Sequence, residues 1–160
     1  MDRILDPYEG HPLHNCFGCS PANEAGLKLE FFEDGDDVVT HWRPSRAFEG
    51  WRNVLHGGIQ ALLLDEICAW VVMRKLQTIG VTSKMEVKYL KPVAADDPCL
   101  TVRARVLRTV RNLAEIESCL YNSAGELCTR ALCTYYDFPP ERARSEREFP
   151  GCHVASEQHG

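Results

Sequence analysis

The sequence predicts an α+β protein in which an antiparallel sheet of six strands wraps around one long central helix. Three observations lead to this fold class. An apolar run at 57–76 has the length and composition of a buried helix. Segments with a two-residue hydrophobic period precede and follow this run. The 160 residues suit one domain with a single core and contain no internal repeat.

The composition narrows the class of function. A net charge of −5 argues against nucleic acid or an anionic membrane as the main partner. The first residues lack the basic start and long apolar run of a signal peptide. The most apolar window, 59–73, is short and holds two carboxylates, so we expect no membrane span. We therefore expect a cytoplasmic protein whose eight cysteines are free thiols.

The N-terminal part is expected to be irregular before the sheet begins. Residues 1–26 are rich in Pro, Gly and Asn, which indicates an arm with at most one short helix. The single domain that holds the sheet and the helix should extend over 27–138. Its first two strands, at 27–32 and 38–42, flank an acidic turn of the residue types that hairpins use.

The central helix is expected at 57–76, because it is apolar nearly all round and ends with cations that favour the helix dipole. Alternating segments after it predict a meander of four strands. We expect the charged segment 139–160 to be a poorly anchored tail. The four strands are expected at 81–89, 100–106, 113–121 and 127–138.

A histidine and two glycines open the central helix, as His56-Gly57-Gly58. Backbone N–H groups at a helix start are unshielded beside glycine, and they and the helix dipole favour negative charge. Asp65 and Glu66 lie in the middle of the apolar run. A carboxylate there is costly unless it is paired or used for chemistry. The segment therefore combines an anion-binding turn with a candidate general base.

The spacing of these groups has a consequence for assembly. Gly57 and Asp65 are separated by ~12 Å along a helix axis, too far for both to contact one reacting atom. Either one of them is irrelevant, or Asp65 works with Gly57 of a second copy. The second option requires a symmetric dimer with the two helices side by side and antiparallel. We adopt it as the hypothesis.

A cysteine pair in the arm raises the question of a metal. His14, Cys16 and Cys19 could supply three zinc ligands. Without a second pair at zinc-binding spacing this pattern is weak, and a tight turn at Gly18 with small buried thiols explains it equally well. We therefore expect no metal and no cofactor. Three residues could supply a fourth ligand: His11, Cys152 and His153.

The sequence resembles the hotdog-fold acyl-CoA thioesterases of the PaaI-like (phenylacetyl-CoA thioesterase) group. The resemblance rests first on HGG followed by an acid nine positions after the His, inside a helix that precedes strands. CFGCSPANEAGLKLEF is similar to the opening of a PaaI-like subgroup, and VLHGGIQALLLDE to its helix start. VKYLKPVAADDP resembles the strand and turn after the helix. Together these stretches span roughly residues 14–138.

The resemblance implies hydrolysis of an acyl-CoA thioester by a homodimer or a dimer of dimers. In the family, the N–H after the His polarises the thioester carbonyl, which places this role on Gly57 with Gly58 beside it. The helix acid of the other subunit activates water or attacks directly, which places that role on Asp65. One branch of the family has a hydroxyl residue one turn beyond the acid, where this chain has Ala69.

Several further residues are candidates for the site. Glu66 competes with Asp65, but it points about 100° around the helix and could contact substrate or pair with an Arg. His56 could hold the turn or assist the departing thiolate, and Asn53 could position substrate or water. A non-catalytic acyl-CoA-binding protein is the alternative function, and Asp65 favours the enzyme. Basic residues that could meet the coenzyme A phosphates are Lys88, Lys91, Arg103, Arg105, Arg108 and Arg111.

Overall fold

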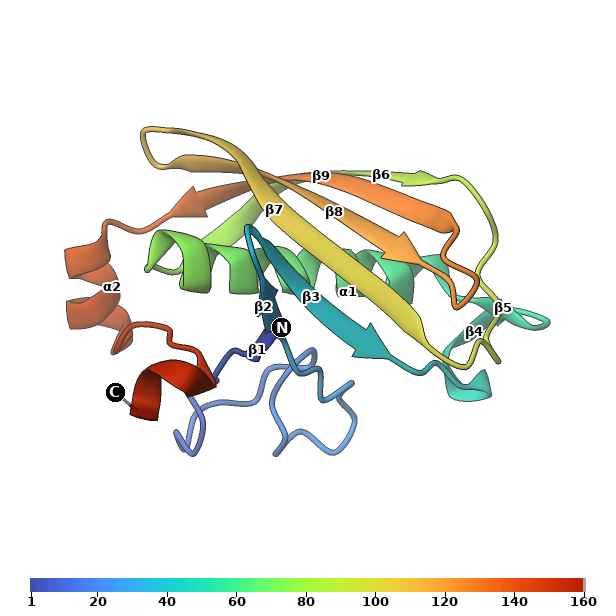
Figure 1. Ribbon diagram of the computed structural model, residues 1–160, viewed down its shortest axis with the longest axis horizontal. Coiled ribbons are helices and arrows are strands. Elements are labelled where there is room, and N and C mark those ends of the chain that lie inside the picture. Colours follow the sequence, from blue (N-terminus) through green and yellow to red (C-terminus); the bar gives the residue numbers. More distant parts are fainter. Residues whose placement is uncertain (160) are drawn as a thin grey trace.

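The computed structural model describes residues 1–159, and it confirms the predicted α+β class. One long helix, α1 (Gly57–Val71), packs against a curved antiparallel sheet (Figure 1). A π-helical turn continues α1 over Val72–Leu76. Within residues 1–159 the main sheet has seven strands in the order β1-β2-β3-β7-β8-β9-β6. These strands are β1 (Asp2–Arg3), β2 (Phe32–Asp34), β3 (Asp37–Trp42), β6 (Gly80–Tyr89), β7 (Leu100–Val110), β8 (Leu113–Tyr121) and β9 (Leu127–Asp137).

Smaller elements complete the chain. A two-stranded ribbon of β4 (Glu49–Trp51) and β5 (Val54–Leu55) leads directly into α1. Helix α2 (Pro140–Arg147) follows the sheet, and short 3₁₀ turns lie at Arg46–Phe48 and Ala155–His159. None of the helices in residues 1–159 has the length and hydrophobicity that a membrane span requires.

The helix is buried by the sheet, as its sequence predicts. Leu63, Leu64, Ile67 and Val71 have no exposed surface, and they pack with the inward side chains of the strands. Burying one such aliphatic side chain stabilises the fold by roughly 1.5–3 kcal/mol. The apolar run therefore becomes the centre of the core.

The expected meander is wrong in one respect, because the strand that follows the helix does not pair with the next strand in the chain. Strand β6 pairs with β9, and residues 90–99 cross the end of the sheet to reach β7 (Figure 1). Side-chain alternation alone does not determine which strand a neighbour pairs with. The result is that β6 forms one edge of the sheet.

A register shift in β6 corrects the predicted alternation of that strand. The two-residue alternation within 81–89 predicts Val81 on the buried face and Thr82 on the outer face. The pairing with β9 shifts between Thr82 and Lys84, so Val81 is 56% exposed and the Thr82 hydroxyl points to α1. Extra residues of this kind re-aim side chains at sheet edges.

The first predicted strand begins later than expected. Lys28 has a φ of +54°, which interrupts an extended strand. The N–H groups of Leu27 and Leu29 donate to the carbonyl oxygens of Phe17 and Gly18 in the arm, rather than to a neighbouring strand. Pairing in the sheet therefore starts at Phe32. The arm of residues 1–26 contains turns and β1, without a helix in this described segment.

The prediction of a poorly anchored tail is wrong for the described part of residues 139–160. Phe149, Cys152 and Val154 are buried, and Val154 pairs with Ile4 beside β1. In Figure 1 the C-terminal segment lies next to the N-terminus. The average composition of the tail is polar, but three spaced apolar side chains are enough to dock it. Gly160 lies outside the described residues.

Charged groups at the end of α1 connect this tail to β2. The Arg74 guanidinium donates to the Glu33 carboxylate at 2.8 Å and to the carbonyl oxygen of Cys152 at 3.0 Å. The hydrogen bonds from Arg74, and then from Lys75, lower the pKa of Glu33 from 4.5 to about 2. Glu33 is therefore ionised in the folded protein down to acid pH.

Replacing Glu33 with Gln should lower the free energy of unfolding at pH 7 by about 1–3 kcal/mol, because partly buried cations lose a charged partner. A carboxylate whose pKa is lowered on folding stabilises the fold above its unfolded pKa, and this contribution is lost as pH falls from 4.5 towards 2. Urea unfolding of both proteins at pH 7 and near pH 2 measures this. Glu30→Gln, in an exposed pair with Arg3, is the control and should cost under about 0.5 kcal/mol.

Candidate active site

The start of α1 presents one free amide. The His56 ring caps the helix, since its Nδ1 accepts the N–H of Gly58 at 2.8 Å. The N–H groups of Ile59 and Gln60 donate to the His56 carbonyl oxygen. Among residues 1–159, the N–H of Gly57 has no hydrogen-bond partner. Gly57 is therefore the amide of this turn that remains available to a ligand.

Strand β6 covers this helix start. The Tyr89 hydroxyl donates to the carbonyl oxygen of Gly57 at 2.7 Å. A Cβ added to Gly57 would lie 3.4 Å from the Tyr89 ring, which is ordinary contact. The end of β6 thus lies beside the free amide.

The Asp65 carboxylate is held by two hydroxyl groups. Its Oδ1 accepts from Thr82 of β6 at 2.7 Å and lies 2.7 Å from the Tyr135 hydroxyl of β9, which also lies 2.7 Å from the Asp65 carbonyl oxygen. Burial, followed by the charge of Asp65, raises the pKa of Tyr135, so this phenol stays protonated and donates. Among residues 1–159, Oδ2 has no hydrogen-bond partner. One oxygen is anchored and the other remains available.

Gly57 and Asp65 do not meet within one chain. Helix rise separates them by ~12 Å. Both border β6, which runs antiparallel to α1: Tyr89 lies at Gly57, and Thr82 lies at Asp65. The free amide and the free carboxylate oxygen are therefore at opposite ends of one edge strand.

The fold, and the segment that carries Gly57 and Asp65, resemble those of a known protein superfamily. Residues 52–129, which include both Gly57 and Asp65, match the family model of the thioesterase superfamily. The fold is the hotdog fold of thioesterases, and the matched segment is similar to that superfamily. The hotdog domain is similar to a hypothetical thioesterase from Streptococcus pneumoniae, solved with coenzyme A. The identity is 25%, 69% of this chain and 85% of that chain are covered, and the TM-score is 0.63.

Two further proteins are similar to this chain, one in fold and one in sequence. The PaaI protein of the Escherichia coli phenylacetic acid degradation operon has the same fold, with a TM-score of 0.64 at 18% identity over 71% of this chain and 81% of that chain. A proposed esterase of Saccharolobus solfataricus is 31% identical over 84 residues, which is 51% of this chain. The match spans 54% of that relative's length, about half.

Glu66, the neighbour of Asp65, faces another part of the hotdog domain. Its carboxylate accepts from Cys16 Sγ at 3.3 Å and from Trp70 Nε1 at 3.4 Å. Burial, followed by the charge of Cys16, raises the pKa of Glu66 to about 7. The structure thus directs Glu66 to the N-terminal arm, away from the hydroxyls that hold Asp65.

Asn53 lies in the turn between β4 and β5. Its φ of +51° is in the left-handed region that Asn tolerates, and its carbonyl oxygen accepts from the N–H of Ala95 at 3.3 Å. This turn directs the chain into α1. The backbone conformation of this turn is therefore sufficient to explain why position 53 is an Asn.

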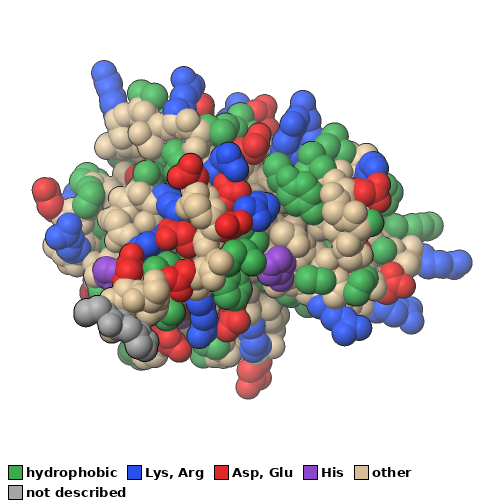
Figure 2. All heavy atoms as spheres, viewed as in Figure 1, with side chains coloured by type: hydrophobic (Ala, Val, Ile, Leu, Met, Phe, Trp, Pro, Cys, Tyr) green, Lys and Arg blue, Asp and Glu red, His purple; other side chains and the backbone are tan. Residues whose placement is uncertain are grey.

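Most of the basic candidates are already paired. Arg103 and Arg105 form ion pairs with Asp37, and Arg103 also pairs with Asp34. On the face shown in Figure 2, basic and acidic side chains are interspersed. Arg108 pairs with Glu115 and Lys91 with Glu126, whereas Lys88 and Arg111 have no ion-pair partner among residues 1–159.

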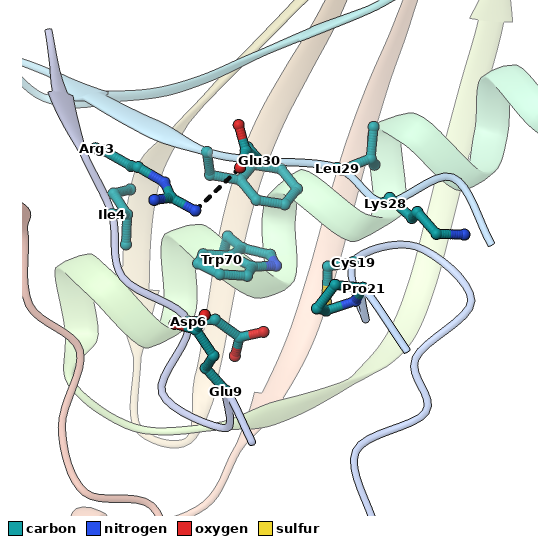
Figure 3. A pocket seen from close by; sticks show the side chains of 11 residues that line it. Arg3, Ile4, Asp6, Glu9, Cys19, Pro21, Lys28, Leu29, Glu30 and Trp70 are labelled. Atoms are coloured by element: carbon teal, nitrogen blue, oxygen red, sulfur yellow. Dashed lines mark hydrogen bonds and ion pairs between the residues drawn. The ribbon is translucent and has the colours of Figure 1, made fainter. Parts of the chain in front are cut away.

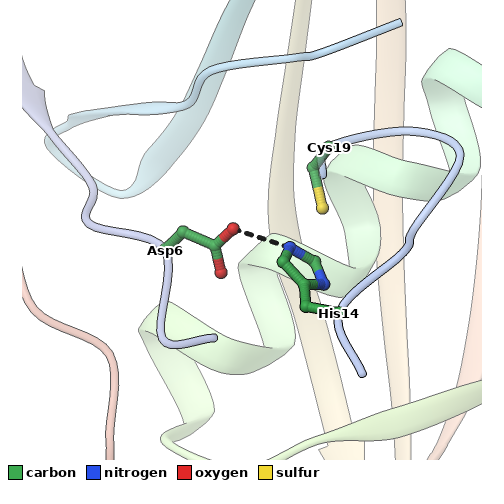
Figure 4. A group of neighbouring side chains, drawn as sticks. All are labelled: Asp6, His14 and Cys19. Carbon is green, nitrogen blue, oxygen red and sulfur yellow. Dashed lines mark hydrogen bonds and ion pairs between the residues drawn. The ribbon is translucent and has the colours of Figure 1, made fainter. Parts of the chain in front are cut away.

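The cysteines of the arm gather against α1. Cys16 and Cys19 lie with Glu66, and His14 lies with Asp6 beside Cys19 (Figure 4). Hydrogen bonds from the Cys19 thiol, and then from the amides of Cys19 and Gly18, lower the pKa of Cys16 to about 5. The suggested fourth ligands lie elsewhere: His11 bonds Glu148, His153 pairs with Glu157, and Cys152 lies at the carbonyl oxygen of Leu5. All eight cysteines are free thiols.

Sequence reasoning missed Thr82, Tyr135 and Tyr89 as parts of the site. A Tyr on the inward face of a strand usually needs a hydrogen-bond partner, which is a signal that could have singled out Tyr135. Thr82 carried no such signal, because the register shift that turns it inward depends on the pairing with β9.

Proposed function

We propose that this protein hydrolyses an acyl-CoA thioester as a homodimer or a dimer of dimers. The observation that carries the proposal is the Asp65 carboxylate, whose Oδ1 is anchored by Thr82 and Tyr135 while Oδ2 is free. A carboxylate in the middle of a buried helix is costly, and a protein that only binds acyl-CoA has no need of it.

The open edge of β6 supports the proposed assembly. Two β6 strands pairing antiparallel, with a two-fold axis midway between Thr82 and Tyr89, would bring each Tyr89 to the partner's Thr82. Within each chain Tyr89 hydrogen-bonds Gly57 and Thr82 hydrogen-bonds Asp65. The free amide of one chain would therefore meet the free carboxylate oxygen of the other. Exposed apolar groups on and after β6 (Val81, Tyr89 and Leu90) would be covered.

The proposed reaction uses these two groups together. The Gly57 N–H donates to the thioester carbonyl oxygen and stabilises the negative charge that develops there. Asp65 Oδ2 takes a proton from water as the water oxygen bonds to the carbonyl carbon. The carbon–sulfur bond then breaks, and the proton passes to the departing thiolate. Direct attack by Asp65 is the alternative first step.

The proposed substrate class rests on comparison and charge. The Streptococcus pneumoniae thioesterase was solved with coenzyme A. Coenzyme A carries phosphates, and Lys88 and Arg111 are basic side chains without an ion-pair partner in residues 1–159. Their charges are therefore available to a phosphate, unlike those of Arg103 and Arg105. His56 is proposed to hold the turn through Gly58.

The test is thiol release from a panel of acyl-CoA esters of different chain length and aromatic character, together with the mass in solution. We expect release with at least one ester and a particle of twice the 18.1 kDa chain mass or a multiple of that dimer. A monomer would remove the composite site. Tight binding of acyl-CoA without release would instead support the binding protein.

A further inference from the structure

A second cluster of reactive side chains lies on the other side of α1. Cys16 Sγ, Cys19 Sγ and a Glu66 carboxylate oxygen all lie within 4.8 Å of one another. Each is partly buried, and Cys16 Sγ is 3.3 Å from Glu66 Oε1. Thiolate and carboxylate groups held this close are a ligand set that suits zinc.

The arm residues around Cys16 are arranged as a binding loop. The Ser20 N–H donates to the Cys16 carbonyl oxygen at 3.0 Å, and the Ser20 hydroxyl donates to the carbonyl oxygen of His14 at 3.0 Å. Hydrogen bonds that hold the ligand residues in place are the supporting contacts that metal sites use. The loop is fixed in turn by hydrogen bonds from Leu27 and Leu29.

Gly18 permits the close approach to the helix. A Cβ on this residue would lie 2.5 Å from Glu66 Cδ, so no other residue type fits without a shift. A glycine between the two cysteines therefore allows the loop to sit directly on the Glu66 carboxylate. The sequence contains the cysteine pair alone, and only the fold adds the third donor.

A second pair of side chains borders the cluster. His14 Nε2 lies 2.8 Å from Asp6 Oδ2, and each of these two residues has a potential metal-ligand atom within 4.8 Å of Cys19 Sγ (Figure 4). A cavity of about 190 Å³ reaches Asp6 and Cys19 from the surface, with Trp70 in its wall (Figure 3). The cluster thus has a route of access and a nearby imidazole–carboxylate pair.

We propose that Cys16, Cys19 and Glu66 bind one zinc ion, with a fourth position on the side of the His14–Asp6 pair. This site would join the N-terminal arm to α1 by metal bonds, next to the helix turn that carries Asp65. It departs from our expectation from sequence that the chain binds no metal. Its role is structural, because it faces away from Thr82 and Tyr135.

The test measures metal content and does not depend on hydrolysis. Protein expressed with added zinc and then dialysed should retain about one zinc ion per chain by mass spectrometry. Cys16→Ser and Glu66→Gln should weaken zinc binding at least about a hundredfold in competition with a chelator. Cys99→Ser, which replaces an exposed cysteine, should bind zinc like the parent protein, as should Asp65→Asn.

Cobalt provides a readout that needs no variant. Addition of Co²⁺ to the metal-free parent protein should produce the near-ultraviolet absorption of a thiolate–cobalt bond, and zinc should remove it and raise the unfolding temperature. The proposal is overturned by parent protein that retains no zinc and shows no thiolate–cobalt band, or by full zinc binding in Cys16→Ser.

Discussion

Asp65→Asn should lower kcat for the best acyl-CoA substrate by about 10³-fold and leave the fold intact. The amide oxygen of Asn can still accept from Thr82 and Tyr135, so the packing around α1 is preserved. What the variant loses is the ability to take a proton from water or to attack the carbonyl carbon. Thiol-release kinetics and circular dichroism on the same sample measure the two effects.

Glu24→Gln is the matched control, because Glu24 is an exposed carboxylate of the N-terminal arm and lies outside β6 and α1. It should keep kcat within a factor of about 2 of the parent protein. Activity of Asp65→Asn within tenfold of the parent would assign the chemistry to another residue.

Gly57→Pro should lower kcat/KM by about 10²–10³-fold, because it removes the one amide donor proposed to bind the thioester oxygen. The position tolerates proline: Gly57 is the first helical residue, whose N–H is not used within the helix. The ψ of His56, 132°, already lies in the extended range that a residue before proline adopts. The measurement is steady-state thiol release, with thermal unfolding to confirm folding.

Gly57→Ala distinguishes the loss of the amide donor from crowding by an added side chain. Its Cβ makes the same contact with the Tyr89 ring, at 3.4 Å, but its N–H remains. It should retain most of the parent activity. Equal losses in Gly57→Ala and Gly57→Pro would show that crowding against Tyr89, and not the missing donor, causes the effect.

Mixing the two inactive variants tests whether each site is formed by two chains. In a mixed dimer, one site would combine Gly57 of the Asp65→Asn chain with Asp65 of the Gly57→Pro chain, and the other site would lack both groups. Random exchange of subunits should therefore restore about a quarter of the parent activity. No recovery after demonstrated exchange would place both groups in the site of one chain.

The sequence predicted the helix and the strands well where the hydrophobic period was long. The β8 strand occurs at 113–121 as expected, and α1 with its π-helical turn covers the expected 57–76. The predicted β6 was right in extent but wrong in its faces, because one shifted residue near Ser83 inverts the alternation before it. The prediction for 139–160 was wrong because it rested on the average composition, in which a few buried apolar residues are outnumbered by charged ones.

Local sequence patterns are enough to predict the buried helix, the glycine turn at its start and the acid within it, because helix periodicity and the cost of a buried carboxylate act locally. The tertiary structure decided which hydroxyls hold Asp65, which amide remains free at Gly57, and that Glu66 turns to Cys16 and Cys19. These contacts join residues that are far apart in the chain. Their partners are set by strand order, register and the path of the arm, none of which a local pattern encodes.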